Sequence, residues 1–404
     1  MKSAEFSRKS RRVSQWLSHV TVVAAMVGAT AGRASAQTIV LPPSYSLTDL
    51  GGAPQSLGFA IDGSGRSVVQ ALNGGFRTAP NQSVNAATDT VCPGFSAGTV
   101  SNPYAINGAG AVVGDAVVQS NGVLARHAFW WDGSTCHDLQ NLTGAVTSLG
   151  RGMSDYGRVV GSFRRSISGL DQAYLAFFFG AGAITMTSLE GALGNPYSSN
   201  ALDVNNLDQI VGYRQMTSTS YARGYVLQMA GAGWIFTDVG VLPGGVYSSA
   251  NAINDNGVVV GQGSTTVNGT FATHAFSFRD ANGNGVSDPG ELVDLDTSGG
   301  TNSNALGVNS VGIVVGNIGV PGFYYTSSAR AVVFVNGTVV DLNNMIPAGS
   351  GLFLEVANGI NDGGQIVGYA RDGAGNRHAF RLDPVYPILQ LLPPPKYYAW
   401  PRGR

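Results

Sequence analysis

One stretch of the sequence decides the fold: Ala252-Ile253-Asn254-Asp255-Asn256-Gly257-Val258-Val259-Val260-Gly261, followed at residues 274–276 by His-Ala-Phe. Its pattern, an Asn followed three residues later by Gly and then by a Val-Val-Gly ending, occurs seven times in a loose form. The copies end at residues 70, 114, 161, 212, 261, 316 and 368, and the first, ending in Val68-Val69-Gln70, is degenerate. Repeats of roughly 40–50 residues with short β-branched runs are typical of propeller blades.

Two further elements follow most copies, and together they predict four short strands per unit. The first element is a triplet of the His-Ala-Phe type, at residues 127–129, 175–177, 223–225, 274–276, 330–332 and 378–380. The second is a polar residue followed by an apolar one, at residues 138–139, 188–189, 238–239, 294–295 and 341–342. The Asn-x-x-Gly segment favours a tight hairpin, since Asn and Gly tolerate positive φ. The sequence shows no sustained 3.6-residue apolar period, so we expect helices to be nearly absent.

The phase of the repeat indicates how the ring closes. The seventh unit ends after Arg381-Leu382 without an Asp-Leu strand, whereas Tyr45 to Leu50 supplies a spare one ahead of the first unit. We therefore predict an all-β, seven-bladed β-propeller of four-stranded blades, closed by the N-terminal strand of the mature chain; closure removes exposed sheet edges. An open β-solenoid needs no spare strand. A six-bladed ring, without the irregular first unit, is the alternative count.

The ends of the chain predict a secreted protein in three segments. Residues 1–36 combine basic residues, an apolar run at 20–31 and Ala34-Ser35-Ala36, which is typical of a secretory signal peptide cleaved before Gln37. The run is too short and too rich in Gly, Ala and Thr for a span of about 30 Å, and Arg11-Arg12 leaves a twin-arginine signal as an alternative. The propeller then covers 37–384. Residues 385–404 form a Pro-rich aromatic tail that we expect to be disordered, with a partner-binding peptide as the alternative.

Composition narrows the range of partners. Removing the predicted signal peptide removes six of the 23 Lys and Arg residues and one of the 24 Asp and Glu residues, which leaves a net charge near −6. A chain of this charge is a poor match for nucleic acid, and no later segment is apolar enough to span a membrane. Charged residues are only 12% of the chain, against a usual ~25%. We expect a secreted or extracellular monomer, with the periplasm or the cell surface as further locations. Its partner would be an extracellular protein or a glycan.

Cysteine usage leaves two readings. The chain has two cysteines, Cys92 and Cys136. Secretion permits a disulfide between them, and two reduced thiols are the other reading.

One local motif predicts a metal site. Residues 280–291, Asp-Ala-Asn-Gly-Asn-Gly-Val-Ser-Asp-Pro-Gly-Glu, fit the twelve-residue calcium loop at every defined position. Calcium binds six to eight oxygens at about 2.3–2.6 Å. The expected ligands are the side chains of Asp280, Asn282, Asn284, Asp288 and Glu291 and the backbone carbonyl of Val286. Because the flanks look like strands, we expect a structural calcium ion in a hairpin; a solvated Asn/Gly turn without metal is the alternative.

The repeat resembles a known family. The unit Ala-Ile-Asn-Asp-x-Gly-x-Val-Val-Gly followed by His-Ala-Phe is similar to that of the HAF family of bacterial extracellular repeat proteins. The resemblance covers about Tyr45 to Pro384, and the His-Ala-Phe triplet is lost or replaced in the first, fourth and sixth units. It implies an extracellular location and a repeat architecture, and it implies no particular activity.

The sequence offers no catalytic constellation. We find no G-x-S-x-G elbow, no H-E-x-x-H and no metal-spaced Cys/His set. The histidines at 127, 274 and 378 share one repeat slot and suit structural roles. We therefore expect a non-enzymatic extracellular binding, adhesion or scaffold protein with one calcium loop. A secreted propeller hydrolase or lyase acting on glycans is the alternative, and clustered Asp/Glu, Arg and Tyr from three or more blades around the central channel would favour it.

Overall fold

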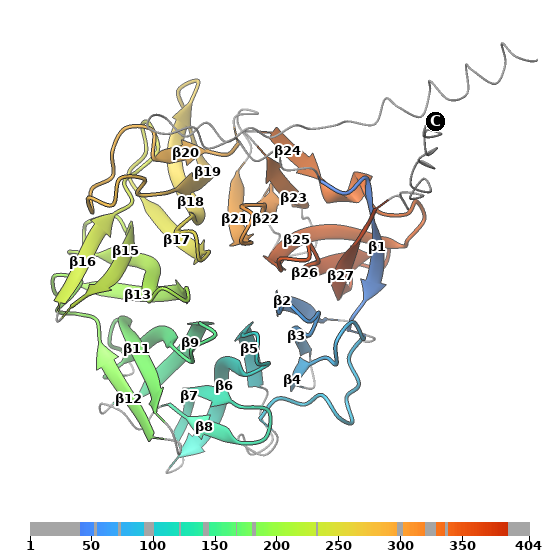
Figure 1. Ribbon diagram of the computed structural model, residues 1–404, viewed down its shortest axis with the longest axis horizontal. Coiled ribbons are helices and arrows are strands. Elements are labelled where there is room, and N and C mark those ends of the chain that lie inside the picture. Colours follow the sequence, from blue (N-terminus) through green and yellow to red (C-terminus); the bar gives the residue numbers. More distant parts are fainter. Residues whose placement is uncertain are drawn as a thin grey trace, which may run out of the picture.

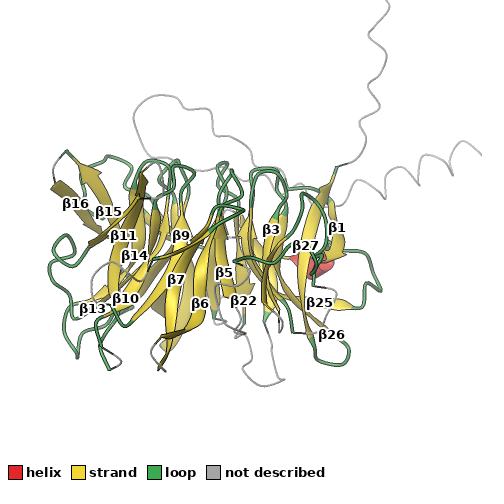
Figure 2. Cartoon of the chain, turned by 90° about the horizontal axis from the view of Figure 1, so that it is seen from below, coloured by secondary structure: helices red, strands yellow, loops and turns green. Residues whose placement is uncertain are grey.

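The computed structural model describes residues 41–386 apart from short gaps at 52–54, 72–73, 93–100, 121–122, 140–144, 167, 180–182, 232, 297–301, 320–328 and 336–337. The predicted signal peptide and residues 387–404 of the predicted tail lie outside the described residues. Seven antiparallel sheets stand around a common axis (Figure 1). Their strands run between the two faces of a disc (Figure 2). The fold is an all-β, seven-bladed β-propeller, as predicted.

In blades 1 to 6 the strands follow the chain from the axis outward. Blade 1 holds β2 (Leu57–Ile61), β3 (Ser67–Ala71) and β4 (Gly74–Arg77). Blade 2 holds β5 (Ser101–Ile106), β6 (Val112–Ser120), β7 (Val123–Trp131) and β8 (Cys136–Asp138). Blade 3 holds β9 (Thr147–Met153), β10 (Val159–Arg164), β11 (Gln172–Phe179) and β12 (Ala183–Ser188). Blade 4 holds β13 (Ser198–Val204), β14 (Gln209–Gln215), β15 (Arg223–Ala230) and β16 (Gly233–Asp238).

Blades 5 to 7 complete the ring. Blade 5 holds β17 (Ser248–Ile253), β18 (Val259–Val267), β19 (Thr270–Phe278) and β20 (Leu292–Asp294). Blade 6 holds β21 (Ser303–Val308), β22 (Val314–Ile318), β23 (Arg330–Val335) and β24 (Thr338–Asp341). Blade 7 holds β25 (Leu352–Ile360), β26 (Ile366–Asp372), β27 (Arg377–Val385) and, outermost, β1 (Ser44–Asp49). The one helical turn among the described residues is the 3-10 helix η1 (Leu342–Asn344).

The N-terminal strand closes the ring as predicted. Strand β1 pairs with β27 from Ser44 opposite Val385 to Asp49 opposite Phe380, so the first and last strands lie side by side in Figure 1. Tyr45 is 2% exposed and packs in the core between blades 6 and 7. Strand β27 extends one residue past the predicted domain end at residue 384.

Blade 1 departs from the predicted four strands. It has three, and the place of the fourth is taken by an isolated bridge between Thr90 and Phe76. A disulfide between Cys92 and Cys136 joins the segment after this bridge to the outer strand of blade 2. The first of the two readings of the cysteines is therefore the one the structure shows, and the bond ties the irregular blade to its neighbour.

The two valines of each Val-Val-Gly serve the two faces of a blade. Val159 packs in a cluster shared by blades 2 and 3, whereas Val160 packs in the next cluster, shared by blades 3 and 4. A sheet buried on both faces needs consecutive apolar residues instead of an alternating pattern. This requirement explains why the repeat carries paired valines.

The repeat Asn joins neighbouring blades. In blade 5 the Oδ1 atom of Asn254 accepts the backbone N–H of Val258 at 2.9 Å, which closes the predicted turn. Its Nδ2 atom donates to the carbonyl of Asn309 in blade 6 at 2.8 Å. The same inter-blade bond recurs in four other places, from Asn107 to Ser154, Asn205 to Asn254, Asn309 to Asn361 and Asn361 to Asp62. The side chain of the repeat Asn therefore caps its own turn and also joins that turn to the next blade.

The His-Ala-Phe and Asp-Leu elements are two halves of one contact. The Nδ1 atom of His274 lies 2.8 Å from Oδ2 of Asp294, and the pairs His127–Asp138 and His378–Asp49 are both 2.9 Å apart. Arg223 and Arg330 occupy the slot in blades 4 and 6 and face Asp238 and Asp341. These histidines stand in three separate blades, in the structural role expected of them.

Two repeat elements were predicted at the wrong residues. In blade 3 Tyr174 lies opposite Gly161, so the triplet is residues 172–174 and not 175–177. In blade 1 the residue that takes the place of the motif's final Gly is Val69, which pairs with Gly58 of the innermost strand, and not Gln70. In both cases short apolar runs allow several registers by sequence, and only the pairing of the strands selects one.

Replacing Asn254 with Ala should lower the free energy of unfolding by about 1–3 kcal/mol, because it leaves buried backbone groups in two blades without partners. Chemical denaturation of both proteins measures this difference. Asn256→Ala is the matched control: this exposed Asn makes one side-chain bond to blade 6, to the carbonyl of Ser310. Equal losses for the two variants would contradict the role assigned to Asn254.

Candidate functional site

Each innermost strand carries a β-bulge at the same place, and the bulges form a ring around the axis. In blade 2, for example, Pro103 pairs with Gly114 and Ala105 with Val113, which leaves Tyr104 without a partner. Equivalent register shifts occur in all seven blades. We call the extra residues the axial ring: Phe59, Tyr104, Arg151, Leu202, Asn251, Leu306 and Asn358. All seven are half-buried.

The bulges re-aim these side chains toward neighbouring innermost strands, as bulges commonly do near functional sites. Asn251 donates to Oδ1 of Asn304 at 2.8 Å and to the carbonyl of Ala305 at 2.9 Å. Asn358 donates to the carbonyl of Gly58 at 2.7 Å. At the level of the ring, amide hydrogen bonds therefore join blade 5 to blade 6 and blade 7 to blade 1.

Blades 1 to 3 contribute a stack of side chains to the ring. The rings of Phe59 and Tyr104 meet edge to face with centroids 5.2 Å apart. The guanidinium carbon of Arg151 lies 4.6 Å from the centroid of Tyr104. Such contacts hold a guanidinium in a fixed orientation and add about 0.5–2 kcal/mol. The stack combines an aromatic surface with a positive charge.

Arg151 is the one charged member of the axial ring, and it makes no ion pair with any described residue. Asp115, whose charge acts on Tyr104 together with that of Arg151, is fully buried and already paired: its Oδ2 atom accepts from Arg126 at 3.0 Å and from Asn102 at 3.1 Å. Burial raises the pKa of Tyr104, and the charges of Asp115 and Arg151 act on it in opposite directions. Among the described residues, the guanidinium of Arg151 is thus held by its stacking on Tyr104.

Two more tyrosines feel the charge of Arg151. Burial raises the pKa of Tyr213 in blade 4 and of Tyr174 in blade 3, and Arg151 partly opposes both shifts. Arg151, Asp115 and three tyrosines thus gather from blades 2, 3 and 4. Asp115 and Tyr174 are fully buried on the second and third strands of their blades, so this group does not supply the cluster around the central channel that would favour an enzyme.

Asp203 occupies a position where the other blades have a small residue. It follows the bulge in blade 4, and its counterparts are Ala60, Ala105, Gly152, Ala252, Gly307 and Gly359. Its two carboxylate oxygens accept the backbone N–H groups of Val204 at 2.9 Å and of Ile253 in blade 5 at 3.0 Å. Burial raises its pKa to about 7, and the negative charge of Asp255 acts in the same direction.

The Asn-x-x-Gly turns place further carboxylates at their face of the disc. The Nδ2 atom of Asn206 donates to Asp155 at 3.0 Å and to Asp255 at 2.9 Å, linking blades 3, 4 and 5. The backbone N–H of Asn206 also donates to Asp255, at 2.8 Å. Positive charge from Arg151 and negative charge from Asp203, Asp155 and Asp255 therefore follow one another along the inner strands.

Sequence reasoning missed the axial ring and Asp203. The bulge leaves no motif, because its residue type differs in every blade. Aligned on the repeat Asn, however, the ring is the position three residues before it, and Asp203 is the one charged residue two before it. At this position six units have Ala or Gly and one has Asp, and this exception is the sequence signal that could have indicated the site.

The predicted calcium loop connects β19 and β20 and folds back on itself. The carboxylate of Asp280 accepts from the backbone N–H groups of Gly283 at 2.7 Å and Gly285 at 2.8 Å. The side-chain amides of Asn282 and Asn284 donate to Oδ2 of Asp288 at 2.6 and 2.9 Å. The carboxylates of this twelve-residue loop therefore accept hydrogen bonds from the loop's own backbone and side-chain donors.

The remaining predicted ligands lie in the same loop. Glu291 accepts the backbone N–H groups of Ala281 at 2.7 Å and Asp288 at 2.9 Å, and the side chain of Val286 is exposed. Ser287 donates to the carbonyl of Val239, which anchors the loop on blade 4. Within the described part of the chain, no three His, Cys, Asp or Glu side chains are grouped to hold a metal. Calcium binding by this loop stays a prediction.

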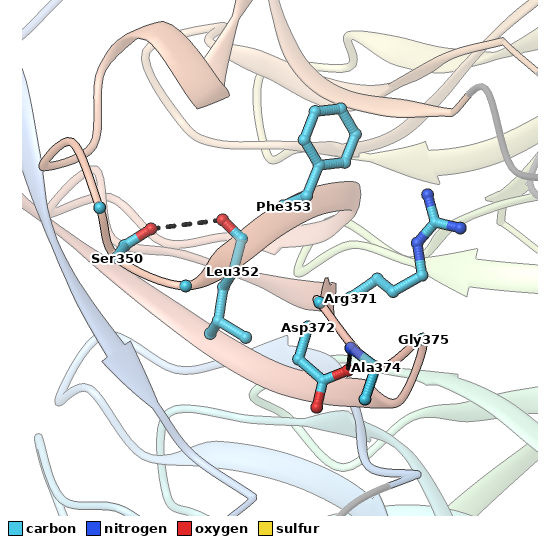
Figure 3. Close-up of a pocket in the computed structure, with 10 residues that line it drawn as sticks. Ser350, Leu352, Phe353, Arg371, Asp372, Ala374 and Gly375 are labelled. Carbon is cyan, nitrogen blue, oxygen red and sulfur yellow. Dashed lines mark hydrogen bonds between the residues drawn. The ribbon is translucent and has the colours of Figure 1, made fainter.

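A cleft of about 680 Å³ lies where β25 begins and β26 ends, between residues 349–353 and 371–375 (Figure 3). Its charged groups are engaged in its own walls. Arg371 lies 3.2 Å from the buried carboxylate of Glu355, and Asp372 accepts the backbone N–H of Ala374 at 2.9 Å. The open shape and the paired charges make this cleft a weaker candidate than the axial ring.

Among the described residues, no helix is long and apolar enough to cross a membrane. Residues 197–376, from blade 4 into blade 7, match a family described as a protein of unknown function, DUF3466. No curated protein matches the chain.

Solved structures of Trypanosoma rangeli sialidase are similar to the chain. The covalent complex with 2,3-difluorosialic acid has a TM-score of 0.39 and 11% identity, over 80% of this chain and 59% of that chain. The complex with sialic acid has a TM-score of 0.38 and 9% identity, over 81% and 60%. The chain therefore spans about three fifths of the length of these sialidases.

The raised pKa of Asp203 predicts a pH-dependent stability. This carboxyl group has a pKa of about 7 in the folded state and an ordinary pKa near 4 in the unfolded chain. Between these two pH values the folded state binds the proton more tightly, so the free energy of unfolding falls as pH rises. Asp203→Ala, the residue found at this position in blades 1, 2 and 5, should therefore gain stability relative to the wild type as pH rises from 5 to 8. The relative gain is on the order of 1 kcal/mol per pH unit up to pH 7. Thermal melts at both pH values measure it, and parallel pH profiles would contradict the assignment.

Proposed function

We propose that the chain is a secreted, non-enzymatic extracellular binding protein of the HAF repeat kind, with a glycan as its partner at the axial ring. Phe59, Tyr104 and Arg151 supply the supporting observation: an aromatic surface and an orientable cation at the centre of a rigid ring. Sugars bind to surfaces of this composition through ring stacking and directional hydrogen bonds. The disulfide suits an oxidising compartment.

Binding without turnover is favoured because the carboxylates near the axis have structural partners. Asp115 is paired with Arg126, and Asp203 holds two backbone N–H groups across blades 4 and 5. A glycosidase needs two carboxyl groups facing one bond, at about 5–9.5 Å from each other. Adhesion and scaffolding remain parts of the same proposal, since both require a binding surface.

A glycan hydrolase or lyase is the second candidate, and Asp203 is the observation that favours it. A carboxyl group with a pKa of about 7 beside the axis has the protonation behaviour of a general acid at neutral pH. If this candidate is right, fluorogenic glycosides or a polysaccharide will be cleaved, and Asp203→Asn will abolish the cleavage.

Glycan-array binding of the full chain tests the leading proposal. We expect binding to a subset of glycans without release of product. Tyr104→Ala should weaken that binding at least tenfold, since truncating an aromatic residue that anchors a bound partner costs about 2 kcal/mol or more. Tyr221→Ala is the matched control, because Tyr221 is an exposed tyrosine far from the innermost strands. The absence of binding to any glycan, or equal loss in both variants, would overturn the proposal.

The loop at 280–291 is proposed to hold one structural calcium ion through Asp280, Asn282, Asn284, Val286, Asp288 and Glu291. The supporting observation is a loop in which backbone N–H groups and side-chain amides already converge on Asp280, Asp288 and Glu291. Binding would require the amides of Asn282 and Asn284 to turn their oxygens inward.

Calorimetric titration with calcium chloride tests this site. We expect one ion to bind with a dissociation constant of about 0.1–1 mM, the range of extracellular modules, and to raise the melting temperature. Glu291→Gln should weaken binding by an order of magnitude or more because it removes the bidentate ligand. Glu190→Gln, which changes a carboxylate of another loop, serves as the control. No binding at millimolar calcium would eliminate the site.

A further inference from the structure

The axial ring contains a cation that the protein itself does not neutralise. Arg151 is half-buried, stacks on Tyr104 at 4.6 Å and forms no ion pair with any described residue. Four other arginines of blades 2 and 3 are paired with carboxylates: Arg126 with Asp115, Arg158 with Asp208, Arg164 with Asp171 and Arg165 with Glu190. Arg77 and Arg214 also stack on aromatic rings without an ion pair to a described residue, but each donates to a backbone carbonyl. A half-buried charge without a counter-ion is costly unless something supplies one. The position therefore calls for an external anion.

The chemistry of the site favours a carboxylate. A guanidinium offers a planar fork of N–H donors that matches the two oxygens of a carboxylate, and stacking on Tyr104 fixes the plane of that fork. A single arginine supplies one positive charge, which balances a singly charged carboxylate and not a dianionic phosphate. Phe59 and Tyr104 beside it form an aromatic surface against which a sugar ring can lie.

The charges farther along the inner strands limit where the ligand ends. Asp203 lies one residue past the bulge level of blade 4, and Asp155 and Asp255 stand at the turns beyond it. A polyanion running along the axis would meet these three carboxylates. The arrangement accepts one anionic group at the level of Arg151 and repels a second one beyond it.

We propose that Arg151 and the Phe59–Tyr104 pair bind the terminal uronic acid residue of an extracellular glycan, with the carboxylate of the sugar on the guanidinium of Arg151. This proposal rests on glycan binding at the axial ring and names the class of sugar. Arg151 then acts as the residue that determines specificity, and Tyr104 as the residue that orients it.

Two ligands of the same shape test it. Methyl β-D-glucuronide and methyl β-D-glucoside share a pyranose ring and differ in a carboxylate against a hydroxymethyl group. Calorimetry, or saturation-transfer NMR for weak binding, should show the glucuronide binding at least tenfold more tightly to the full chain, since a charge-assisted hydrogen bond contributes about 1.5–3 kcal/mol.

Variants assign the preference to Arg151. In Arg151→Gln the two ligands should bind with equal affinity, and Arg151→Lys should restore only part of the difference because the bidentate fork is gone. Arg165→Gln, from the same blade but paired with Glu190, should retain the full preference. An unchanged melting temperature in Arg151→Gln shows that the loss is one of recognition and not of folding.

Three results would overturn the inference, and they separate it from the general proposal. If neutral glycans bind in a Tyr104-dependent way without preference for the glucuronide, the axial ring binds glycans but Arg151 does not select uronic acids. If glucose 6-phosphate binds more tightly than the glucuronide, the site is not one for carboxylates. If no glycan binds at all, the proposed function fails together with the inference.

Discussion

In six of the seven blades a carbonyl oxygen of the bulged inner strand lies directly against the second strand, and the rest of the structure depends on this contact. A Cβ atom at Gly114 would stand 2.0 Å from the carbonyl oxygen of Asn102, and one at Gly261 would stand 2.0 Å from that of Ser249. The same restriction, at 1.9 to 2.0 Å, applies to Gly161, Gly212, Gly316 and Gly368. Glycine ends the Val-Val-Gly motif because no side chain fits beside a bulge. The bulge in turn presents one residue of each blade to the axis, and the type of this residue differs from blade to blade.

This division between fixed and variable positions explains how far the sequence could be interpreted. The repeated Asn, the paired valines, the glycine and the His/Asp elements each satisfy a requirement that is the same in every blade, so they repeat and reveal the fold. The spare strand at residues 45–50 indicated how the ring closes for the same reason, because it supplies the outer strand that the seventh unit lacks. Periodicity could not reveal Tyr104, Arg151 or Asp203, since a site is made by the departures from a repeat.

Two failures of alignment have a common physical cause. In blade 1 Val69 takes the position of the motif's glycine, opposite Gly58 of the inner strand. In blade 3 Gln172 replaces the histidine and Ser188 the aspartate, so the hydrogen bond that marks the register elsewhere is missing. Where the specific contact is replaced, apolar runs alone do not determine the register. The disulfide beside blade 1 shows that this least regular blade is held by a covalent bond to its neighbour.

The pairing of β1 with β27 has a consequence for the way the protein folds. The strand that forms first along the chain must wait for the strand that forms last, so the closing contact has nearly the greatest sequence separation the described chain allows. Contacts between distant residues carry a loop-closure cost and slow the folding of β-proteins. Until β27 is available, the blades can stack only as an open arc with an unpaired strand at its end, a state prone to association with other chains. The ring should therefore assemble late and cooperatively, and any chain that ends before β27 is left without a closed form.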